Sequence, residues 1–143
     1  MIRGLLYFVM LFMALAFMRC SDVAVGFLFT DDASYTQDTL RITRFSNLDE
    51  EDIDVTIPWV TSQVEQLLGT EPLTYSLAGV KSSNGQEAAK DFTKYLTVIG
   101  GGRMYVDAKV DSPVGYYTVS LKIENEGHTA ILEDIFTFEV RDN

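Results

Sequence analysis

The sequence predicts an all-β fold: an antiparallel β-sandwich of about seven strands with one or two short helical insertions. The chain has 143 residues, which is the usual size of one domain. Hydrophobic residues make up 47% and aromatic residues 12%, enough to build a core. Along most of the chain apolar and polar residues alternate, a pattern typical of antiparallel strands with one face on a core and the other in water.

Six segments carry this alternation. They span residues 39–43, 52–57, 73–77, 103–110, 116–123 and 136–140. Residues 95–99 show a less regular pattern and predict a seventh strand. Turn-forming residues at 100–102 and 111–113 separate neighbouring segments, as expected for a sandwich of short strands.

Two stretches between these strands predict short helices. Ser62 and Glu65 fit a capping box for a helix that ends at Gly69, and a second helix is expected over residues 86–91. Residues 21–37 lack sustained alternation and predict a tether or a first edge strand. The chain is therefore divided into a signal segment (1–20), this tether or edge strand (21–37) and the sandwich domain (38–143).

The first twenty residues form an apolar segment of a different kind. Arg3 precedes an almost unbroken apolar run from Leu5 to Met18, and a charged start followed by such a run is typical of a signal peptide. The run is shorter than the roughly 20 apolar residues that cross a bilayer as a helix. We therefore expect a signal helix that directs export.

Cys20, the only cysteine of the chain, ends this run. It resembles the lipid-modified cysteine of bacterial lipoproteins, and the Cys-Ser-Asp start is similar to that of Bacteroidetes lipoproteins. Those signal sequences usually place a small residue before the cysteine, whereas this chain has Arg19. Cleavage at the Ala14-x-Ala16 pattern and an uncleaved anchor helix therefore stay open. The resemblance implies a lipid anchor in the outer membrane with display at the cell surface; a periplasmic or secreted protein is the alternative.

Residues 112–140 carry a second resemblance. The strand Gly-Tyr-Tyr-Thr-Val-Ser-Leu and the later Asp-Ile-Phe-Thr-Phe-Glu-Val are similar to the closing hairpin of bacterial Ig-like and cadherin-like modules. Combined with the Cys-Ser-Asp start, they resemble the small Ig-like domains of Bacteroidetes glycan-utilisation lipoproteins. The resemblance implies an Ig-like sandwich. It does not imply calcium binding, because Asn125 stands where such modules often carry aspartate.

The charge of the chain limits its partners and cofactors. Its formal net charge is -10, which disfavours nucleic acid as a partner. One cysteine and one histidine cannot supply a four-ligand zinc site. Asp49, Glu51 and Asp52 are candidate calcium ligands, although their spacing lacks the glycine and terminal glutamate of an EF-hand, and a solvated acidic loop is the alternative. No cofactor is expected.

No catalytic motif stands out. His128 lies in a predicted turn at 125–129, and nothing in the spacing selects Glu126 or Ser120 as its partner in acid–base chemistry. The sequence therefore predicts a turn histidine in solvent and no enzyme activity.

Aromatic and basic residues supply the candidate ligand-binding set. Tyr105 and Tyr116 fall on the polar phase of their strands and should point outward; on adjacent strands they would form a cross-strand pair. Arg103 and Lys109 share the phase of Tyr105 and would add hydrogen-bond donors. Trp59 could stack on a sugar ring or pack on the core.

These features predict a non-catalytic lipoprotein module of the cell envelope that takes part in capture of an extracellular polymer such as a glycan. The alternative is a structural or adaptor lipoprotein that binds a protein partner of the envelope.

Overall fold

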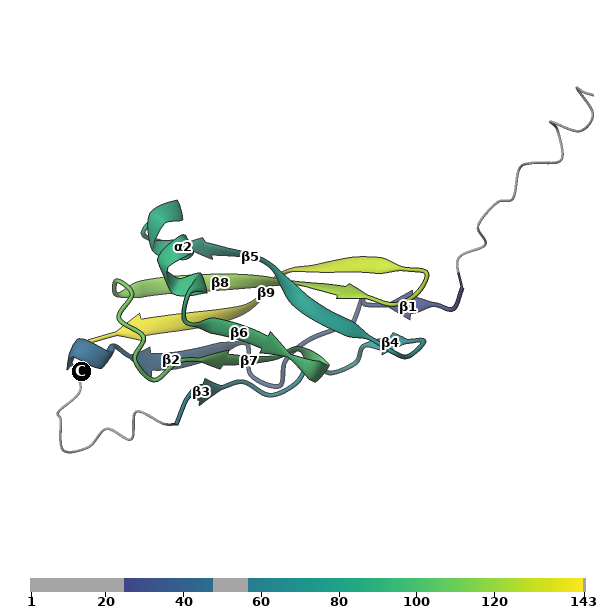
Figure 1. Ribbon diagram of the computed structural model, residues 1–143, viewed down its shortest axis with the longest axis horizontal. Helices are drawn as coiled ribbons and strands as arrows, with labels where there is room; N and C mark the ends of the chain where they lie inside the picture. The colour runs from purple at the N-terminus through teal and green to yellow at the C-terminus, as the bar shows by residue number, and fades with distance from the viewer. Residues whose placement is uncertain (1–24, 48–56, 143) are drawn as a thin grey trace, which may run out of the picture.

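The computed structural model describes residues 25–47 and 57–142, and confirms an all-β sandwich with a short helix (Figure 1). One sheet has four strands in the order β2-β9-β8-β5, and the other has three in the order β3-β7-β6. A two-stranded ribbon, β1-β4, lies at the end of the molecule where the described chain begins (Figure 1).

The strands have the following bounds. They are β1 (Leu28–Phe29), β2 (Thr39–Thr43), β3 (Trp59–Val60), β4 (Leu68–Gly69), β5 (Thr74–Ser82), β6 (Leu96–Ile99), β7 (Arg103–Val106), β8 (Gly115–Glu124) and β9 (Thr129–Arg141). The single α-helix of this part of the chain is α2 (Gln86–Thr93), and short 3-10 helices occur at η1 (Phe45–Asn47) and η2 (Gly100–Gly102).

Most of the alternating segments are strands. The segments at 39–43, 73–77, 95–99, 116–123 and 136–140 correspond to β2, β5, β6, β8 and β9. The segment at 103–110 ends early, at Val106, because Asp107 forms a turn: its carboxylate accepts a hydrogen bond from the Lys109 amide (2.8 Å) and its carbonyl accepts one from the Val110 amide (3.0 Å). The segment at 52–57 lies almost entirely outside the described residues.

The predicted helix at 62–69 is wrong. The backbone there does not form a helix, because residues distant in the sequence, in η2 and before β2, take its hydrogen-bonding groups. The Val64 amide donates to the Gly101 carbonyl (2.9 Å), and Glu65 exchanges backbone hydrogen bonds with Ser34 (2.7 and 3.1 Å). Gln66 has a left-handed backbone (φ 56°), and β4 follows. The helix predicted at 86–91 is confirmed as α2.

The expectation of a wholly antiparallel arrangement is also wrong at one place. β2 pairs with β9 in parallel, with Leu40 opposite Phe138 and Ile42 opposite Val140. These strands lie at opposite ends of the described chain, so no tight hairpin forces them to run in opposite directions. The other strand pairs are antiparallel.

The core lies between the two sheets and under α2. Phe92 of α2 is fully buried and stacks on Tyr117 with ring centroids 4.5 Å apart; Phe138 lies 5.5 Å from it. Met104 and Leu121 face this core from the two sheets and are fully buried. Helix α2 is thus held to the sandwich by an aromatic cluster.

Candidate functional site

The outer surface of the four-stranded sheet presents a continuous polar face. Its side chains follow the strand register in two rows: Thr39, Thr137, Thr118 and Lys81 in one, and Arg41, Glu139 and Tyr116 in the other. We call these seven residues the polar face. Their partners in alternation point inward to the core, which is why the outward set can be polar.

Tyr116 is the aromatic residue of this face, and its side chain is 53% exposed. It lies directly opposite Glu139, which lies opposite Arg41 on the next strand. The Glu139 carboxylate accepts hydrogen bonds from Arg41 (3.1 Å) and Arg141 (2.5 Å). These contacts, Arg141 foremost, hold the pKa of Glu139 below its usual value.

Both arginines keep donors for another partner. Their side chains are 71% and 48% exposed for Arg41 and Arg141, while that of Glu139 is only 11% exposed. Each guanidinium carries five N–H donors, and one carboxylate uses few of them. The exposed ring of Tyr116 therefore lies beside two guanidinium groups, those of Arg41 and Arg141, which still have N–H donors free for a ligand.

A β-bulge in the four-stranded sheet forms a hollow beside the polar face. Between Val119 and Leu121 of β8, the single residue Ser120 faces three residues of β9, residues 133–135, and β5 has an irregularity at the same level. Asp134 adopts a left-handed backbone (φ 51°), and its amide donates a hydrogen bond to the Ser120 hydroxyl (2.9 Å). Such bulges re-aim side chains and are common next to binding sites.

This hollow has a volume of about 240 Å³. Gly79 lines the hollow, and a Cβ added at this position would have no neighbouring atom within 4 Å. A ligand can therefore approach the backbone of Gly79 closely. Lys81 lines one side, and its ammonium group pairs with Asp134 (2.7 Å). The contact with Asp134 raises the pKa of Lys81.

A second hollow has a volume of about 600 Å³. It is lined by six residues of the segment before β2 and by four residues of β9. Three of its lining residues are acidic, namely Asp31, Asp38 and Glu133. It is therefore less suited to an anionic ligand than the polar face.

Tyr105 and Tyr116 do not form the expected cross-strand pair. Tyr105 belongs to β7 of the three-stranded sheet and Tyr116 to β8 of the four-stranded sheet, so their outward rings point away from opposite sides of the sandwich. Tyr105 is half-buried and lies between Val60 and Thr97 in the register. Apolar and polar residues alternate in the same way in both strands, and this pattern does not indicate which sheet a strand belongs to.

The remaining candidate residues are dispersed. Arg103 is exposed on β7, near Tyr105, whereas Lys109 lies in the turn that ends the segment. Trp59 pairs in register with the buried Val106 and packs against the core. None of these three residues lies on the polar face.

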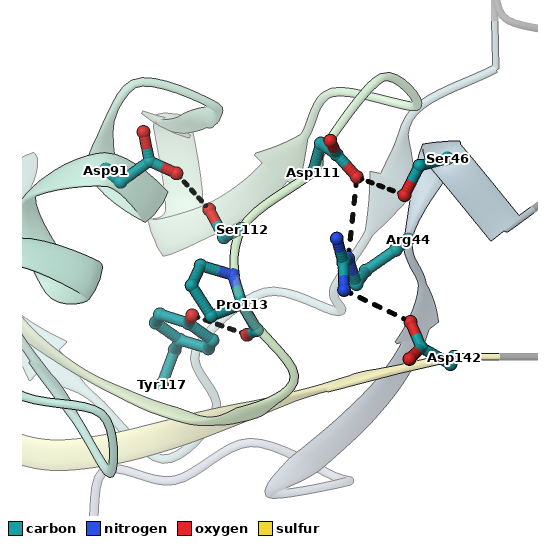
Figure 2. A network of polar contacts seen from close by, with 8 residues as sticks. All are labelled: Arg44, Ser46, Asp91, Asp111, Ser112, Pro113, Tyr117 and Asp142. Carbon is teal, nitrogen blue, oxygen red and sulfur yellow. Dashed lines mark hydrogen bonds and ion pairs between the residues drawn. The ribbon is translucent and has the colours of Figure 1, made fainter.

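The connection between β7 and β8 is fixed by hydrogen bonds to the start of β8 and to α2 (Figure 2). The Tyr117 hydroxyl donates to the Pro113 carbonyl (2.6 Å), and the Ser112 hydroxyl donates to Asp91 of α2 (2.8 Å). Hydrogen bonds from Lys94 and Ser112 lower the pKa of Asp91. The connection is thus tied to both the core strand and the helix.

Arg44 ties the same connection to the ends of β2 and β9 (Figure 2). Its guanidinium lies 3.4 Å from Asp111 and 3.3 Å from Asp142. The Ser46 hydroxyl donates to Asp111 (2.6 Å), and this bond, together with Arg44, lowers the pKa of Asp111. The β7–β8 connection and the ends of β2 and β9 are therefore joined by polar contacts.

The structure leaves the calcium prediction untested, because Asp49, Glu51 and Asp52 lie outside the described residues. Cys20 and the signal segment also lie outside them. In residues 25–47 and 57–142, no cluster of three histidine, cysteine or acidic residues could hold a metal ion. His128 lies in the β8–β9 turn, half-buried rather than fully in solvent; its amide donates to Asn125 (2.9 Å).

Nothing in the sequence predicted that Arg41, Glu139 and Arg141 form one group. Arg41 and Glu139 are 98 residues apart, and only the parallel β2–β9 pairing brings them together. Their outward phase was visible in the alternation of each strand, but the pairing was not.

No protein-family model matches this chain, and no curated protein sequence matches it. Among solved structures, the chain is similar to a SusE-like, surface-located polysaccharide-binding protein from the heparin utilisation locus of Bacteroides thetaiotaomicron, with a TM-score of 0.50 and 17% sequence identity. The match covers 82% of this chain but 15% of that protein. At this identity the likeness shows a shared fold, and the chain spans a small part of the other protein's length.

Proposed function

We propose that this chain is a non-catalytic module of the cell surface that takes part in capture of an extracellular polysaccharide, and that the polysaccharide lies on the polar face. The observation that carries the proposal is the exposed Tyr116 ring beside the Arg41–Glu139–Arg141 group. An exposed aromatic ring offers a rigid apolar surface to the face of a sugar, and the guanidinium and hydroxyl groups around it can bind sugar hydroxyls.

The likeness to a SusE-like polysaccharide-binding protein supports the same function. We further propose that the sandwich, residues 38–143, is Ig-like. The sheets β2-β9-β8-β5 and β3-β7-β6 support this, as does the hydrogen bond from Tyr117 to the carbonyl of Pro113, four residues upstream, which resembles the tyrosine corner of such domains. Export and an acylated Cys20 complete the proposal of an outer-membrane lipoprotein.

The face is tested by electrophoresis of the purified protein through gels that contain polysaccharides, with neutral glucans, mannans and heparin in the panel. We expect at least one polysaccharide to retard the protein, and Tyr116→Ala to weaken that binding about tenfold, equivalent to about 1.4 kcal/mol. The matched control is Tyr105→Ala, which removes an outward tyrosine from the opposite sheet and should leave retardation unchanged. Equal effects of the two variants would contradict binding at the polar face.

A protein partner is the second candidate, and one feature favours it. β5 is a nine-residue strand at one edge of the four-stranded sheet, where an extended segment of another protein could add as a further strand. No retardation by any polysaccharide, together with capture of an envelope protein that is lost when proline replaces Lys81, would favour this candidate over glycan capture.

A further inference from the structure

Four apolar side chains project from the β1–β4 end of the molecule. Val25, Phe27, Phe29 and Leu68 are 56%, 47%, 63% and 64% exposed; we call them the apolar tip. Phe29 and Leu68 lie opposite each other in the ribbon, and the rings of Phe27 and Phe29 are 5.5 Å apart. Phe27, Phe29 and Leu68 therefore form one patch, and Val25 lies two residues before it in the chain.

The ribbon that carries the tip is fixed to the sandwich. The Asn125 side-chain amide, in the β8–β9 turn, donates to the carbonyls of Phe27 (2.9 Å) and Thr70 (3.3 Å). Phe27 and Thr70 also exchange hydrogen bonds of 3.0 and 3.1 Å. Leu28, between the two phenylalanines, packs against the core. This pinning holds the phenylalanine rings outward, because turning them in would expel Leu28.

The chain order shows what lies near the tip. Val25 follows Cys20 by five residues, and a fully extended chain spans at most about 3.6 Å per residue. An acyl chain on Cys20 would thus keep Val25 within about 18 Å of the bilayer surface. This step rests on the proposed function, which includes the anchor.

The polar face lies toward the other end. Tyr116 is at the start of β8 and Glu124 at its end, beside the Asn125 turn that holds the ribbon. A strand rises about 3.4 Å per residue, so these two positions are about 27 Å apart. In Figure 1 the ribbon lies at the opposite end of the long axis from the C-terminus. With the tip at the membrane, Tyr116 lies at the far end of the domain, with its side chain on the outer surface of the sheet.

We propose that the apolar tip inserts into the bilayer that carries the anchor and seats the domain upright on it. Phenylalanine and leucine are residue types that enter the boundary between headgroups and acyl chains. Asp31, Asp32 and Glu71 follow the two strands of the ribbon, so the surface that fits is zwitterionic rather than anionic. The short tether and the fixed ribbon together limit the orientations of the polar face.

The test places tryptophan at the tip of the full-length acylated protein in phosphatidylcholine vesicles. Phe29→Trp is compared with Val114→Trp, an exposed position before β8 at the far end, and the signal of the native Trp59 is subtracted. We expect lipids with brominated acyl chains to quench at least about half of the Phe29→Trp emission, which should also shift to shorter wavelength, and to leave Val114→Trp unchanged.

Three outcomes overturn the proposal. If brominated lipids quench both positions equally or neither, the tip is not seated. A blue shift without quenching that grows with protein concentration shows a second copy of the chain on the tip instead. Mass spectrometry that finds no acyl chain on Cys20 removes the anchor and the seating together. Failure of glycan capture is a separate result, because the Phe29→Ser, Leu68→Ser variant should keep its retardation in polysaccharide gels.

Discussion

The two ends of the sandwich are built on the same pair of strands but expose opposite chemistry. At the start of β8, hydrogen bonds and ion pairs join α2, the β7–β8 connection and the ends of β2 and β9 (Figure 2). At the end of β8, the turn at Asn125 holds a ribbon whose outward side chains are apolar. Rigidity is thus reached at both ends by polar contacts, and the two ends differ in what they leave for a partner.

The difference teaches that exposure, and not residue type, separates the roles of the phenylalanines. Phe92 under α2 is fully buried, whereas Phe29 on the ribbon is 63% exposed. The first contributes its full apolar area to folding, and the second contributes little. A side chain that does little for stability and still occupies a fixed outward position is available for binding.

The largest expected effect on stability comes from the buried phenylalanine of this comparison, Phe92. Phe92→Ala should lower the free energy of unfolding by about 3–5 kcal/mol, because it empties the space against Tyr117 and Phe138. Urea unfolding followed by circular dichroism measures the change. Phe29→Ala is the matched control and should stay within about 0.5 kcal/mol. Similar losses for both variants would mean that the ribbon is part of the core.

A smaller effect is expected from the contact that pins the ribbon. Asn125→Asp keeps the oxygen that accepts from the Gly127 and His128 amides but loses the donor to Phe27 and Thr70. We expect a local loss of about 1.4 kcal/mol, seen as about tenfold faster hydrogen exchange at Thr70. The amides of Gly127 and His128 should exchange as before. Faster exchange throughout the hairpin would show instead that Asn125 supports the whole turn.

The smallest effect concerns pH at the other end. Because arginine contacts lower the pKa of Glu139 from its ordinary 4.5, its contribution to stability is present above that value and is lost as the pH falls through the lowered pKa. Glu139→Gln should therefore flatten the fall of the urea midpoint below about pH 4.5. Glu87→Gln on α2 controls for the change in net charge. An unchanged acid slope in Glu139→Gln would contradict the role of this carboxylate.

The sequence predicted the long strands well because alternation is a local signal. β8 and β9 follow it over many residues, and their inward positions, from Tyr117 to Ile123 and from Phe136 to Val140, are fully or almost fully buried. The two-residue strands β3 and β4 carry too little pattern to be found. The capping box at Ser62 failed because its local helical preference was outweighed by backbone pairing with Ser34 and Gly101.

The candidate site was less predictable, since it depends on which strands are neighbours. The outward phase of Tyr116 and Tyr105 followed from the alternation, but their separation onto opposite sheets did not. Arg41 and Glu139 are brought together by the parallel pairing of β2 with β9. A parallel pair has no hairpin turn that could be recognised in the sequence. The bulge at Ser120 and Asp134 depends on a register shift, which a single sequence does not show.

The position of β9 has a consequence for timing. It is the latest of the described strands in chain order, yet it lies between β2 and β8 in the middle of its sheet. Before β9 forms, β2 has no partner strand in that sheet. The pairing of β2 with β9 closes a loop that contains almost the whole described chain. The four-stranded sheet is therefore completed by a contact between residues far apart in the sequence, and contacts of this kind form slowly during folding.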